Sequence, residues 1–540
     1  MEKVIGNNND KKSYMIVPRT GISLQDMNIR PMSTQELDTL LTSSNIEIID
    51  RIERSNKTLQ LLGMPSGEGI ATDVLVVRMS PQEAEQFQKN PQVIISENQT
   101  LRHLSSMDLE YLKIFSTSAN FTTKIFKLLI NGKDSNAPLK GVNVYITGDG
   151  LKPAVGVTNE EGIVELHVQM VAPNSPFQLK IMPPHSYWSF IKNNPELEEG
   201  ITNTIYLTSI FENNGSDIKH FSLGWGQNLM GLSKMPPDID GKQVKIAIID
   251  SGCDNSHPSL RHILKGADFS SRNADSSSWS NDPYNHGTHC AGVIAAKSSE
   301  HSMFRGFAPE AEVHILKIFP GDREVGLSAL QHALEYCIVN DIDIINMSIG
   351  VEGYDPIIEQ TITAAVDDGI TCVVAAGNSF KENKTVLYPG SSAQVLTVSA
   401  IGDLQSVESN SLDSLTVTDK LDGNLFSPIF TCLGPEVDVC APGVSIISTA
   451  PGSVFKLDSG TSMAAPHVTG MAALLLAHHP IFQSEFKTRN RQRVEALMAL
   501  LHQQCKPLNL DSDRCGTGVP ILGSVVTIPD HLPIPNPVSV

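Results

Sequence analysis

The sequence predicts an α/β fold in which helices cover both faces of a parallel sheet, preceded by a ferredoxin-like α+β domain and a small β-sandwich. Three observations lead to this prediction. In the second half of the chain, near-continuous apolar strands alternate with helix-like segments, as expected for a buried parallel sheet. Near the N-terminus, strand-like and helix-like segments follow the ferredoxin-like order β-α-β-β-α-β. Between these regions, short strands separated by turn residues are typical of a β-sandwich.

The ferredoxin-like order rests on segments whose ends carry clear signals. The strand YMIVPR precedes a helix that begins at STQELDTLL, where Ser33 and Glu36 form a capping box. IEIIDRIE and TDVLVVRMS are predicted strands, and PQEAEQFQKN is a predicted helix with Pro81 near its start. The strand QVIISENQ completes the pattern.

The α/β region contains the apolar strands VKIAIID, AEVHILKIF, IDIINMSIG, ITCVVAAG and VLTVSAIG, with helix-like segments such as GLSALQHALEYCIVN between them. Ligands of such folds bind beyond the carboxyl ends of the strands. We divide the chain into a flexible N-terminus (1–13), the ferredoxin-like domain (14–104), a linker (105–119), the β-sandwich (120–210), a second linker (211–223), the α/β domain (224–523) and a proline-rich tail (524–540).

The composition argues against several classes of protein. The chain has 40 lysines and arginines against 59 aspartates and glutamates, a net charge of −19, whereas a nucleic-acid partner requires a basic surface. No apolar run reaches the roughly 18 residues that a membrane span needs. The segment MEKVIGNNNDKKSYMIV lacks the apolar core of a signal peptide. We therefore expect a cytoplasmic protein with mostly reduced cysteines, with export by a route that needs no N-terminal signal left open.

Two candidate catalytic groups stand near predicted strand and helix ends. The strand VKIAIID ends in Asp250, which is either a turn-forming aspartate or a carboxylate facing the cleft. In NHGTHCAG, His286 and His289 precede a helix-like run but lack the glutamate of the zinc pattern His-Glu-x-x-His, so no metal site is predicted. We interpret His286 as a general base oriented by Asp250, and His289 as a packed neighbour.

Two further polar residues complete a possible acyl-transfer site. Asn378 follows an apolar strand and a glycine, which is ordinarily a turn position, but its amide can donate to a developing oxyanion. Ser462 in LDSGTSMAAPHV begins an apolar helix, where a lone serine is usually a cap. As a nucleophile there, its own backbone N–H would be a second oxyanion donor. The four residues together favour catalysis by an activated serine.

The motifs IIDSG, NHGTHCAG, INMSIG, AAGNS, YPG, EVDVCAPGVSIISTAPG and GTSMAAPHVTG resemble those of the subtilisin-like serine peptidases, in the same order, over about residues 241–480. The order Asp, His, Ser is that of subtilisin. The resemblance implies a subtilisin-like sheet and an endopeptidase that cleaves polypeptides without a cofactor. It implies a triad of Asp250, His286 and Ser462, an oxyanion-hole Asn378, and a substrate cleft lined by Ser348, Ile349, Gly350, Ala375, Ala376 and Gly377. The first three of these cleft residues would also pair with an extended substrate backbone.

The resemblance also implies a zymogen. Residues 14–104 would be an inhibitory propeptide, the chain's own intramolecular inhibitor, which plugs the cleft until it is cut away. The β-rich region between propeptide and catalytic domain departs from the family pattern. Maturation could therefore follow cleavage after about Leu104, cleavage in the 210–222 linker, or no cleavage.

Two smaller implications concern metals. Cys290 follows the HGTH motif as in proteinase K-like members and would be a free thiol beneath the base, sensitive to thiol-binding metals. The segment AAKSSEHSMFRGFAP is short of the carboxylates and amides found in the calcium loop of many members, so no calcium is expected there. Structural calcium elsewhere stays open.

One alternative from another class is a catalytically silent subtilisin fold that serves as a binding or scaffold protein, with the β-rich region doing the recognition. Within the enzyme class, a dedicated processing protease competes with a broad degradative one.

Overall fold

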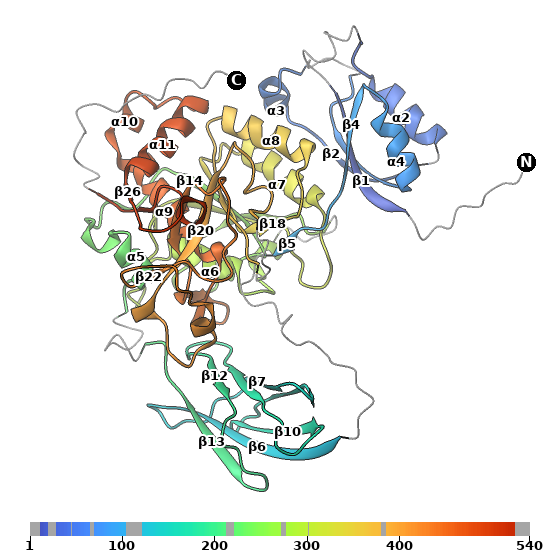
Figure 1. The fold of residues 1–540 in the computed structure, drawn as a ribbon. Coiled ribbons are helices and arrows are strands. Elements are labelled where there is room, and N and C mark those ends of the chain that lie inside the picture. The colour runs from blue at the N-terminus through green and yellow to red at the C-terminus, as the bar shows by residue number, and fades with distance from the viewer. Residues whose placement is uncertain are drawn as a thin grey trace, which may run out of the picture.

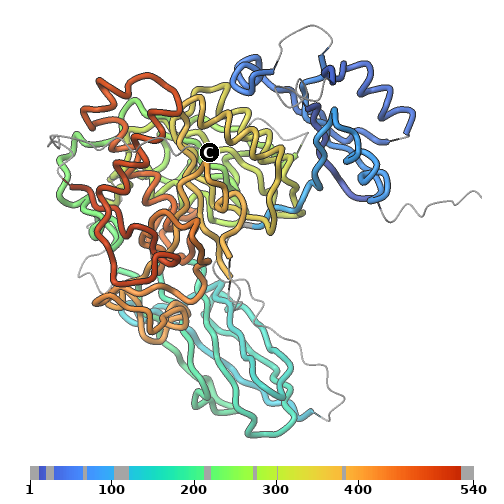
Figure 2. The backbone as a smooth tube through the Cα atoms, turned by 45° about the horizontal axis from the view of Figure 1, so that its top comes forward, coloured from blue at the N-terminus to red at the C-terminus, as the bar shows by residue number. Residues whose placement is uncertain are grey.

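The computed structural model describes residues 11–19, 29–44, 46–64, 70–103, 121–211, 221–271, 277–300, 302–379 and 385–523. Figures 1 and 2 show an N-terminal α+β part in blue, a β-rich part in cyan, and a large α/β part from green to red. The predicted linker 105–119, the proline-rich tail 524–540 and most of the second linker lie outside the described residues.

The N-terminal part is one antiparallel sheet with two helices that open on capping boxes. Its strands β1 (Lys12–Pro18), β2 (Glu47–Ile52), β3 (Val74–Met79) and β4 (Val93–Glu97) lie in the order β2-β3-β1-β4. Helices α2 (Thr34–Ser43) and α4 (Pro81–Gln88) begin with reciprocal bonds between Ser33 and Glu36 and between Ser80 and Glu83. Strand β1 begins before the predicted boundary at residue 14, and a further helix, α3 (Asn56–Leu61), was not predicted.

The β-rich part contains two four-stranded sheets that enclose a common apolar core. One sheet has the order β13-β6-β10-β8, with β13 (Thr202–Leu207), β6 (Thr122–Gly132), β10 (Ile163–Met170) and β8 (Leu151–Lys152). The other has the order β12-β11-β7-β9, with β12 (Phe190–Asn193), β11 (Gln178–Met182), β7 (Asn143–Thr147) and β9 (Ala154–Val157). Inward apolar residues alternate with exposed polar ones along β10, as expected for a strand with one buried face.

The α/β part is built on a nine-stranded sheet with the order β15-β16-β14-β17-β19-β20-β22-β21, in which β23 also pairs with β20. Parallel pairing confirms the prediction for β16 (Glu312–Lys317), β14 (Lys245–Asp250), β17 (Ile344–Met347), β19 (Thr371–Ala375) and β20 (Leu396–Asp403). Two further parallel strands, β15 (Lys265–Asp268) and β23 (Val439–Pro442), were not predicted. The short strands β21 (Leu421–Asp422) and β22 (Leu425–Phe426) extend it antiparallel and were not predicted.

Helices cover both faces of this sheet. Along β14, Ile246 and Ile248 face the core that contains α6 (Gly287–Ala295) and α9 (Thr461–His478), while Ala247 and Ile249 face the core that contains α7 (Leu327–Val339) and α8 (Pro356–Asp367). This alternation follows from the two-residue period of a strand and explains the near-continuous apolar sequence.

Shorter elements flank these layers. They are β18 (Ile349–Gly350), the hairpin of β24 (Ile446–Ala450) and β25 (Val454–Asp458), β26 (Cys505–Lys506), β27 (Val519–Pro520), α5 (Trp225–Leu229), α10 (Pro480–Gln483), α11 (Arg491–Gln503), α12 (Ser512–Cys515) and the 3₁₀ turns η4 (Leu232–Lys234), η5 (Ser278–Ser280), η6 (Leu404–Ser406) and η7 (Leu412–Thr416). Among the helices that the structure describes, none has the length and apolar character needed to cross a membrane.

Candidate active site

Asp250 and His286 lie together at one edge of the sheet. Asp250 is the last residue of β14, His286 directly precedes α6, and both are buried. His286 Nδ1 lies 2.9 Å from Oδ1 and 3.0 Å from Oδ2 of Asp250. Gly287 permits this approach, because a Cβ there would lie 2.1 Å from the carbonyl oxygen of Gly252 and 3.2 Å from Cβ of Asp250.

The carboxylate controls the protonation of the imidazole. Burial by itself lowers the pKa of His286, but the charge of Asp250 and the hydrogen bond to it raise that pKa well above its ordinary value. Because Nδ1–H of His286 donates to Asp250, Nε2 is the ring nitrogen that can accept a proton from a nucleophile.

A second carboxylate behind this pair was missed in the sequence. Asp282 accepts hydrogen bonds from the backbone N–H and the hydroxyl of Thr288 at 2.8 and 2.6 Å, and so anchors the first turn of α6. Ser251 Oγ lies 2.7 Å from Oδ1 of Asp282 and 3.0 Å from Oδ1 of Asp250. The chain gives little local signal of this contact, because an aspartate in a loop before a proline is a common turn residue.

Ser462 is the second residue of α9 and is buried. Four residues later Pro466 lacks the N–H that would normally bond to the Ser462 carbonyl oxygen. That carbonyl instead accepts hydrogen bonds from Ser348 Oγ at 3.2 Å and from Cys290 Sγ at 3.4 Å. Cys290 Sγ also lies 3.9 Å from Nδ1 of His286. The thiol, which belongs to α6, therefore links the helix that follows the histidine to the helix that carries the serine.

Burial raises the pKa of the Cys290 thiol to about 11, so it is protonated at neutral pH and donates a hydrogen bond as an S–H group. Its sensitivity to thiol-binding metals stays a prediction.

Asn378 is held beside the start of α9 by its side-chain oxygen. Asn378 Oδ1 accepts hydrogen bonds from the backbone N–H of Thr461 at 3.0 Å and from its hydroxyl at 2.9 Å. The Thr461 hydroxyl also accepts a hydrogen bond from the Gly377 N–H at 3.2 Å. Gly377 has φ of +111°, and a Cβ there would lie 2.9 Å from Cγ of Leu387, so this position favours glycine. With its oxygen fixed in this way, the amide group of Asn378 turns its N–H donors away from Thr461.

The other two histidines of the motifs have structural contacts. His289 Nε2 lies 2.9 Å from the carbonyl oxygen of Ile446, and burial lowers the pKa of His289 to about 3. His467 Nδ1 lies 2.7 Å from the carbonyl oxygen of Met463, and burial lowers the pKa of His467 to about 4. Both are therefore neutral near pH 7.

An extended segment of the N-terminal part lies along the site. Strand β5 (Arg102–His103) pairs antiparallel with β18, with Arg102 opposite Gly350 and His103 opposite Ile349. On its other side, the Leu101 N–H donates to the carbonyl of Val325 at 2.8 Å. The segment 99–103 thus forms the middle strand between two edges of the α/β part, next to Ser348 and its bond to the serine carbonyl.

The remaining predicted cleft residues are buried and use their backbone groups internally. Ala376 N–H donates to Val398 and its carbonyl accepts from the Leu387 N–H, at 2.9 and 3.0 Å. The Gly377 carbonyl accepts from the Cys432 N–H at 2.9 Å. Their role in binding substrate stays a prediction.

Among the described residues, one group of three potential metal ligands, Asp250, His286 and Cys290, has donor atoms within 4.8 Å of one another. The carboxylate and imidazole are paired and the thiol holds its proton, so we assign no resident metal to this group.

Comparison with known proteins agrees with this geometry. Residues 241–513 match the model of the subtilase family. Subtilisin NAT of Bacillus subtilis subsp. natto is 35% identical over 263 residues, covering 48% of this chain and 62% of that protein. Subtilisin of Bacillus pumilus is 34% identical over 263 residues, covering 48% of this chain and 86% of that protein. The major intracellular serine protease of Bacillus subtilis (strain 168) is 30% identical over 299 residues, covering 54% of this chain and 84% of that protein. The chain thus spans less than two thirds of the first of these relatives.

Proposed function

The chain belongs to the subtilase family, and from this premise we propose that it is a serine endopeptidase that hydrolyses peptide bonds through an acyl-enzyme at Ser462. The observation that carries the proposal is the buried pair of Asp250 and His286, joined through Cys290 to the serine at the start of α9.

Each residue has a defined task in the proposed reaction. His286 Nε2 accepts the proton of the Ser462 hydroxyl as its oxygen attacks the scissile carbonyl carbon, and then gives that proton to the leaving amine. Asp250 holds the imidazole in the required tautomer and stabilises its protonated form. Water, activated by the same histidine, then hydrolyses the acyl-enzyme. These steps use protein groups and water, and subtilases need no cofactor for them.

The oxyanion that forms in each step would accept hydrogen bonds from the Asn378 amide and the Ser462 backbone N–H. We therefore expect Asn378→Ala to lower kcat by about 10²–10³, the loss known for one oxyanion-hole donor in subtilisin, with a small change in KM. The measurement is steady-state hydrolysis of a peptide substrate by the mature enzyme. The control is Asn340→Ala, at the residue that follows α7, which should leave kcat unchanged. An unchanged kcat in Asn378→Ala would show that Asn378 takes no part in the reaction.

We also propose that the N-terminal part is a ferredoxin-like inhibitory prodomain. Its strand β5 pairs with β18, which is predicted to pair with an extended substrate, and Leu101 beside this strand is buried with 4% of its surface exposed. The strand ends at His103, and Leu104 lies outside the described residues. Because this strand pairs with β18 as an extended substrate would, we favour cleavage after about Leu104 among the three maturation outcomes. The β-rich part, proposed as a β-sandwich accessory module, would then stay with the enzyme.

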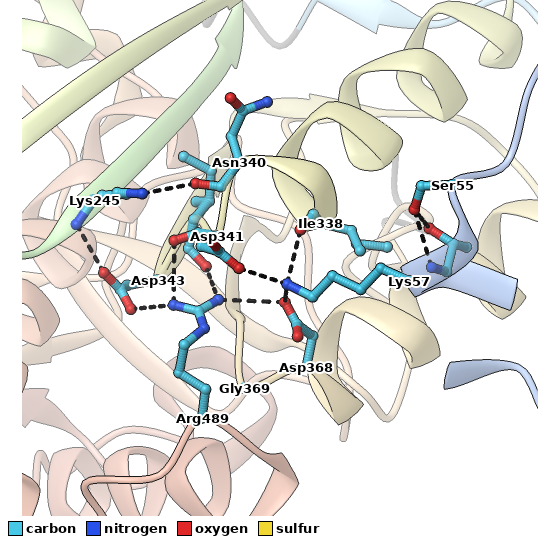
Figure 3. A network of polar contacts seen from close by, with 12 residues as sticks. Ser55, Lys57, Lys245, Ile338, Asn340, Asp341, Asp343, Asp368, Gly369 and Arg489 are labelled. Atoms are coloured by element: carbon cyan, nitrogen blue, oxygen red, sulfur yellow. Dashed lines mark hydrogen bonds and ion pairs between the residues drawn. The ribbon is translucent and has the colours of Figure 1, made fainter. Parts of the chain in front are cut away.

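A second contact supports the prodomain assignment. Figure 3 shows Lys57 of α3 reaching across to the α/β part. Its ammonium group donates to the Ile338 carbonyl at 3.0 Å and pairs with Asp341 at 2.6 Å and Asp368 at 2.7 Å. Asp368 also binds Arg489 at 3.3 Å, so the lysine joins an ion-pair network of the catalytic domain. Helix α3 therefore anchors the prodomain away from the cleft.

If the strand inhibits, disrupting its buried anchor should expose the nucleophile. We expect Leu101→Asp to raise the rate at which a fluorophosphonate probe labels the uncleaved chain by at least about tenfold, because burying the new carboxylate in the groove is costly. Thr100→Asp places the same charge on the exposed neighbouring side chain and should label like wild type. The readout is the labelled full-length band on a gel. Equal labelling of all three chains would count against inhibition by this strand.

A further inference from the structure

The β-rich module contacts the α/β part through its loop before β12 and its last residues. The Ser186 N–H donates to the carbonyl of Phe455, in β25, at 2.9 Å. The Phe211 and Phe455 rings meet edge to face with centroids 6.4 Å apart. Trp188 and Ile210 are buried and belong to the main core of the α/β part. The module is therefore packed against the enzyme rather than tethered to it.

The same loop and strand β12 contact a segment that directly follows β20. We define this segment as residues 404–426. The Ile191 N–H donates to the Asn410 carbonyl at 2.7 Å, and the Leu412 N–H donates to Ser189 Oγ at 2.9 Å. Figures 1 and 2 both show the cyan module meeting this orange segment.

Asp413, the residue after this contact, binds the segment that leads to the nucleophile. It is buried, and its two oxygens accept hydrogen bonds from Ser459 Oγ and Ser445 Oγ, each at 2.7 Å. Ser459 Oγ also accepts a hydrogen bond from the Ser445 N–H at 2.8 Å. Ser445 has φ of +55°, a conformation that a residue with a side chain rarely adopts without such support. Asp413 thus ties together the two ends of the β24–β25 hairpin, and the chain runs from its second end into Ser462.

The hairpin in turn holds the helix that follows the catalytic histidine. His289 Nε2 lies 2.9 Å from the Ile446 carbonyl oxygen. Ser448 Oγ donates to the carbonyl of His289 and Thr449 Oγ1 donates to that of Thr288, both at 2.8 Å. The β24–β25 hairpin therefore contacts the side of α6, the helix that follows His286. The C-terminal end of the hairpin leads into Ser462. A shift of the hairpin would therefore change the distance between His286 and Ser462.

We propose that Asp413 is a positioning residue of the peptidase and that the β-rich module supports it from outside, as a fixed brace of the active site. The proposal rests on the peptidase function proposed above. It gives the module a task in catalysis that needs no ligand of its own, and it requires the module to remain docked in the mature enzyme.

The central test compares Asp413→Ala with Asp403→Ala. Asp403 accepts its hydrogen bonds from Gln405 and Ser406 next to it, so its loss leaves the hairpin contacts intact. We expect Asp413→Ala to lower kcat about 10- to 100-fold, because small displacements of catalytic groups have effects of this size, with KM within about threefold of wild type because the substrate groove is untouched. Asp413→Asn keeps one acceptor oxygen and should recover part of the loss, which a general loss of stability does not predict.

The contribution of the β-rich module to the active site is tested by substitutions in the module itself, at and beside β12. Ser189→Glu puts a larger, charged side chain into the contact with Leu412, whereas Lys192→Glu puts the same group on an exposed position of β12. We expect Ser189→Glu to lower kcat in the same direction as Asp413→Ala by a smaller factor, and Lys192→Glu to match wild type.

Each variant is expressed as the full chain and assayed after maturation, with active sites titrated by a fluorophosphonate probe.

Hydrogen exchange of residues 446–458, measured in a Ser462→Ala background to prevent self-cleavage, should be faster in Asp413→Ala than in Asp403→Ala. An active wild type with equal kcat in both variants would overturn the brace. A wild type that neither hydrolyses peptides nor reacts with the probe would overturn the peptidase function instead, and the exchange comparison would still decide the brace. If Asp413→Ala does not fold, Asp413→Asn takes its place in the measurements of kcat and of hydrogen exchange.

Discussion

Replacing Ser462 by alanine is expected to abolish peptide hydrolysis, with kcat falling about 10⁶-fold, the loss known when the serine of a subtilisin triad is removed. The residual rate comes from substrate binding and the oxyanion donors, which the substitution leaves in place. The fold should survive, because the hydroxyl is a small group and the Ser462 carbonyl, not its side chain, binds Ser348 and Cys290. Steady-state kinetics and the melting temperature check both expectations.

The same variant shows whether the chain cuts itself. Intact-mass analysis of purified wild type beside Ser462→Ala should give a shortened product in the wild type alone, and its mass identifies the cut. A cut after Leu104 would leave the β-rich module covalently attached to the enzyme, whereas a cut in the 210–222 linker would leave it held by its packing contacts alone. Ser484→Ala, at an exposed position after α10, is the matched control and should behave as wild type. Wild-type kinetics in Ser462→Ala would contradict the assignment of the nucleophile.

Replacing Asp250 by asparagine should lower kcat about 10⁴-fold, a loss of the size known when the aspartate of a catalytic triad is neutralised. Asparagine keeps the size of the side chain but can hold His286 in the wrong tautomer, with Nε2 protonated and unable to accept the serine proton. Asp254→Asn is a matched control in the same loop, because Asp254 accepts hydrogen bonds from Ser256 and Gly452 rather than from the histidine. A loss of kcat of similar size in Asp250→Asn and Asp254→Asn would indicate a disturbance of the segment after β14 rather than the loss of the Asp250–His286 pair.

The pair also sets the pH dependence of the reaction. His286 must be neutral to act as a base, so activity is lost as the pH falls through its pKa. Because Asp250 raises that pKa, the acid limb of kcat/KM in wild type should lie above the ordinary value for histidine. In Asp250→Asn the residual activity should keep its acid limb at lower pH, which a pH series on both enzymes measures.

The sequence predicted the parallel sheet and its helices because their signals are local. A buried strand such as β14 needs apolar residues on both faces, and the start of α2 needs the reciprocal bonds of Ser33 and Glu36, so both can be recognised from neighbouring residues. The edge strand β15, with the sequence KGAD, carries no such pattern and was missed. Helix α3 was missed because its six residues are too few to show a period.

The candidate site divides in the same way. Asp250, His286, Asn378 and Ser462 could be named as candidates because each stands in a short motif at the end of a strand or the start of a helix. Asp282 and Asp413 were not found, because nothing in the residues beside them indicates that their partners are Thr288, Ser445 and Ser459.

For this protein, the sequence by itself determined the five neighbouring strands β16, β14, β17, β19 and β20 of the central sheet, and which four residues are candidates for catalysis. The tertiary structure alone decided that the strand of residues 102–103 pairs with β18 and that the module meets the segment holding Asp413. The physical reason is that a local pattern records what a residue needs, such as burial or a hydrogen-bond partner. Which distant residue meets that need depends on how the whole chain packs.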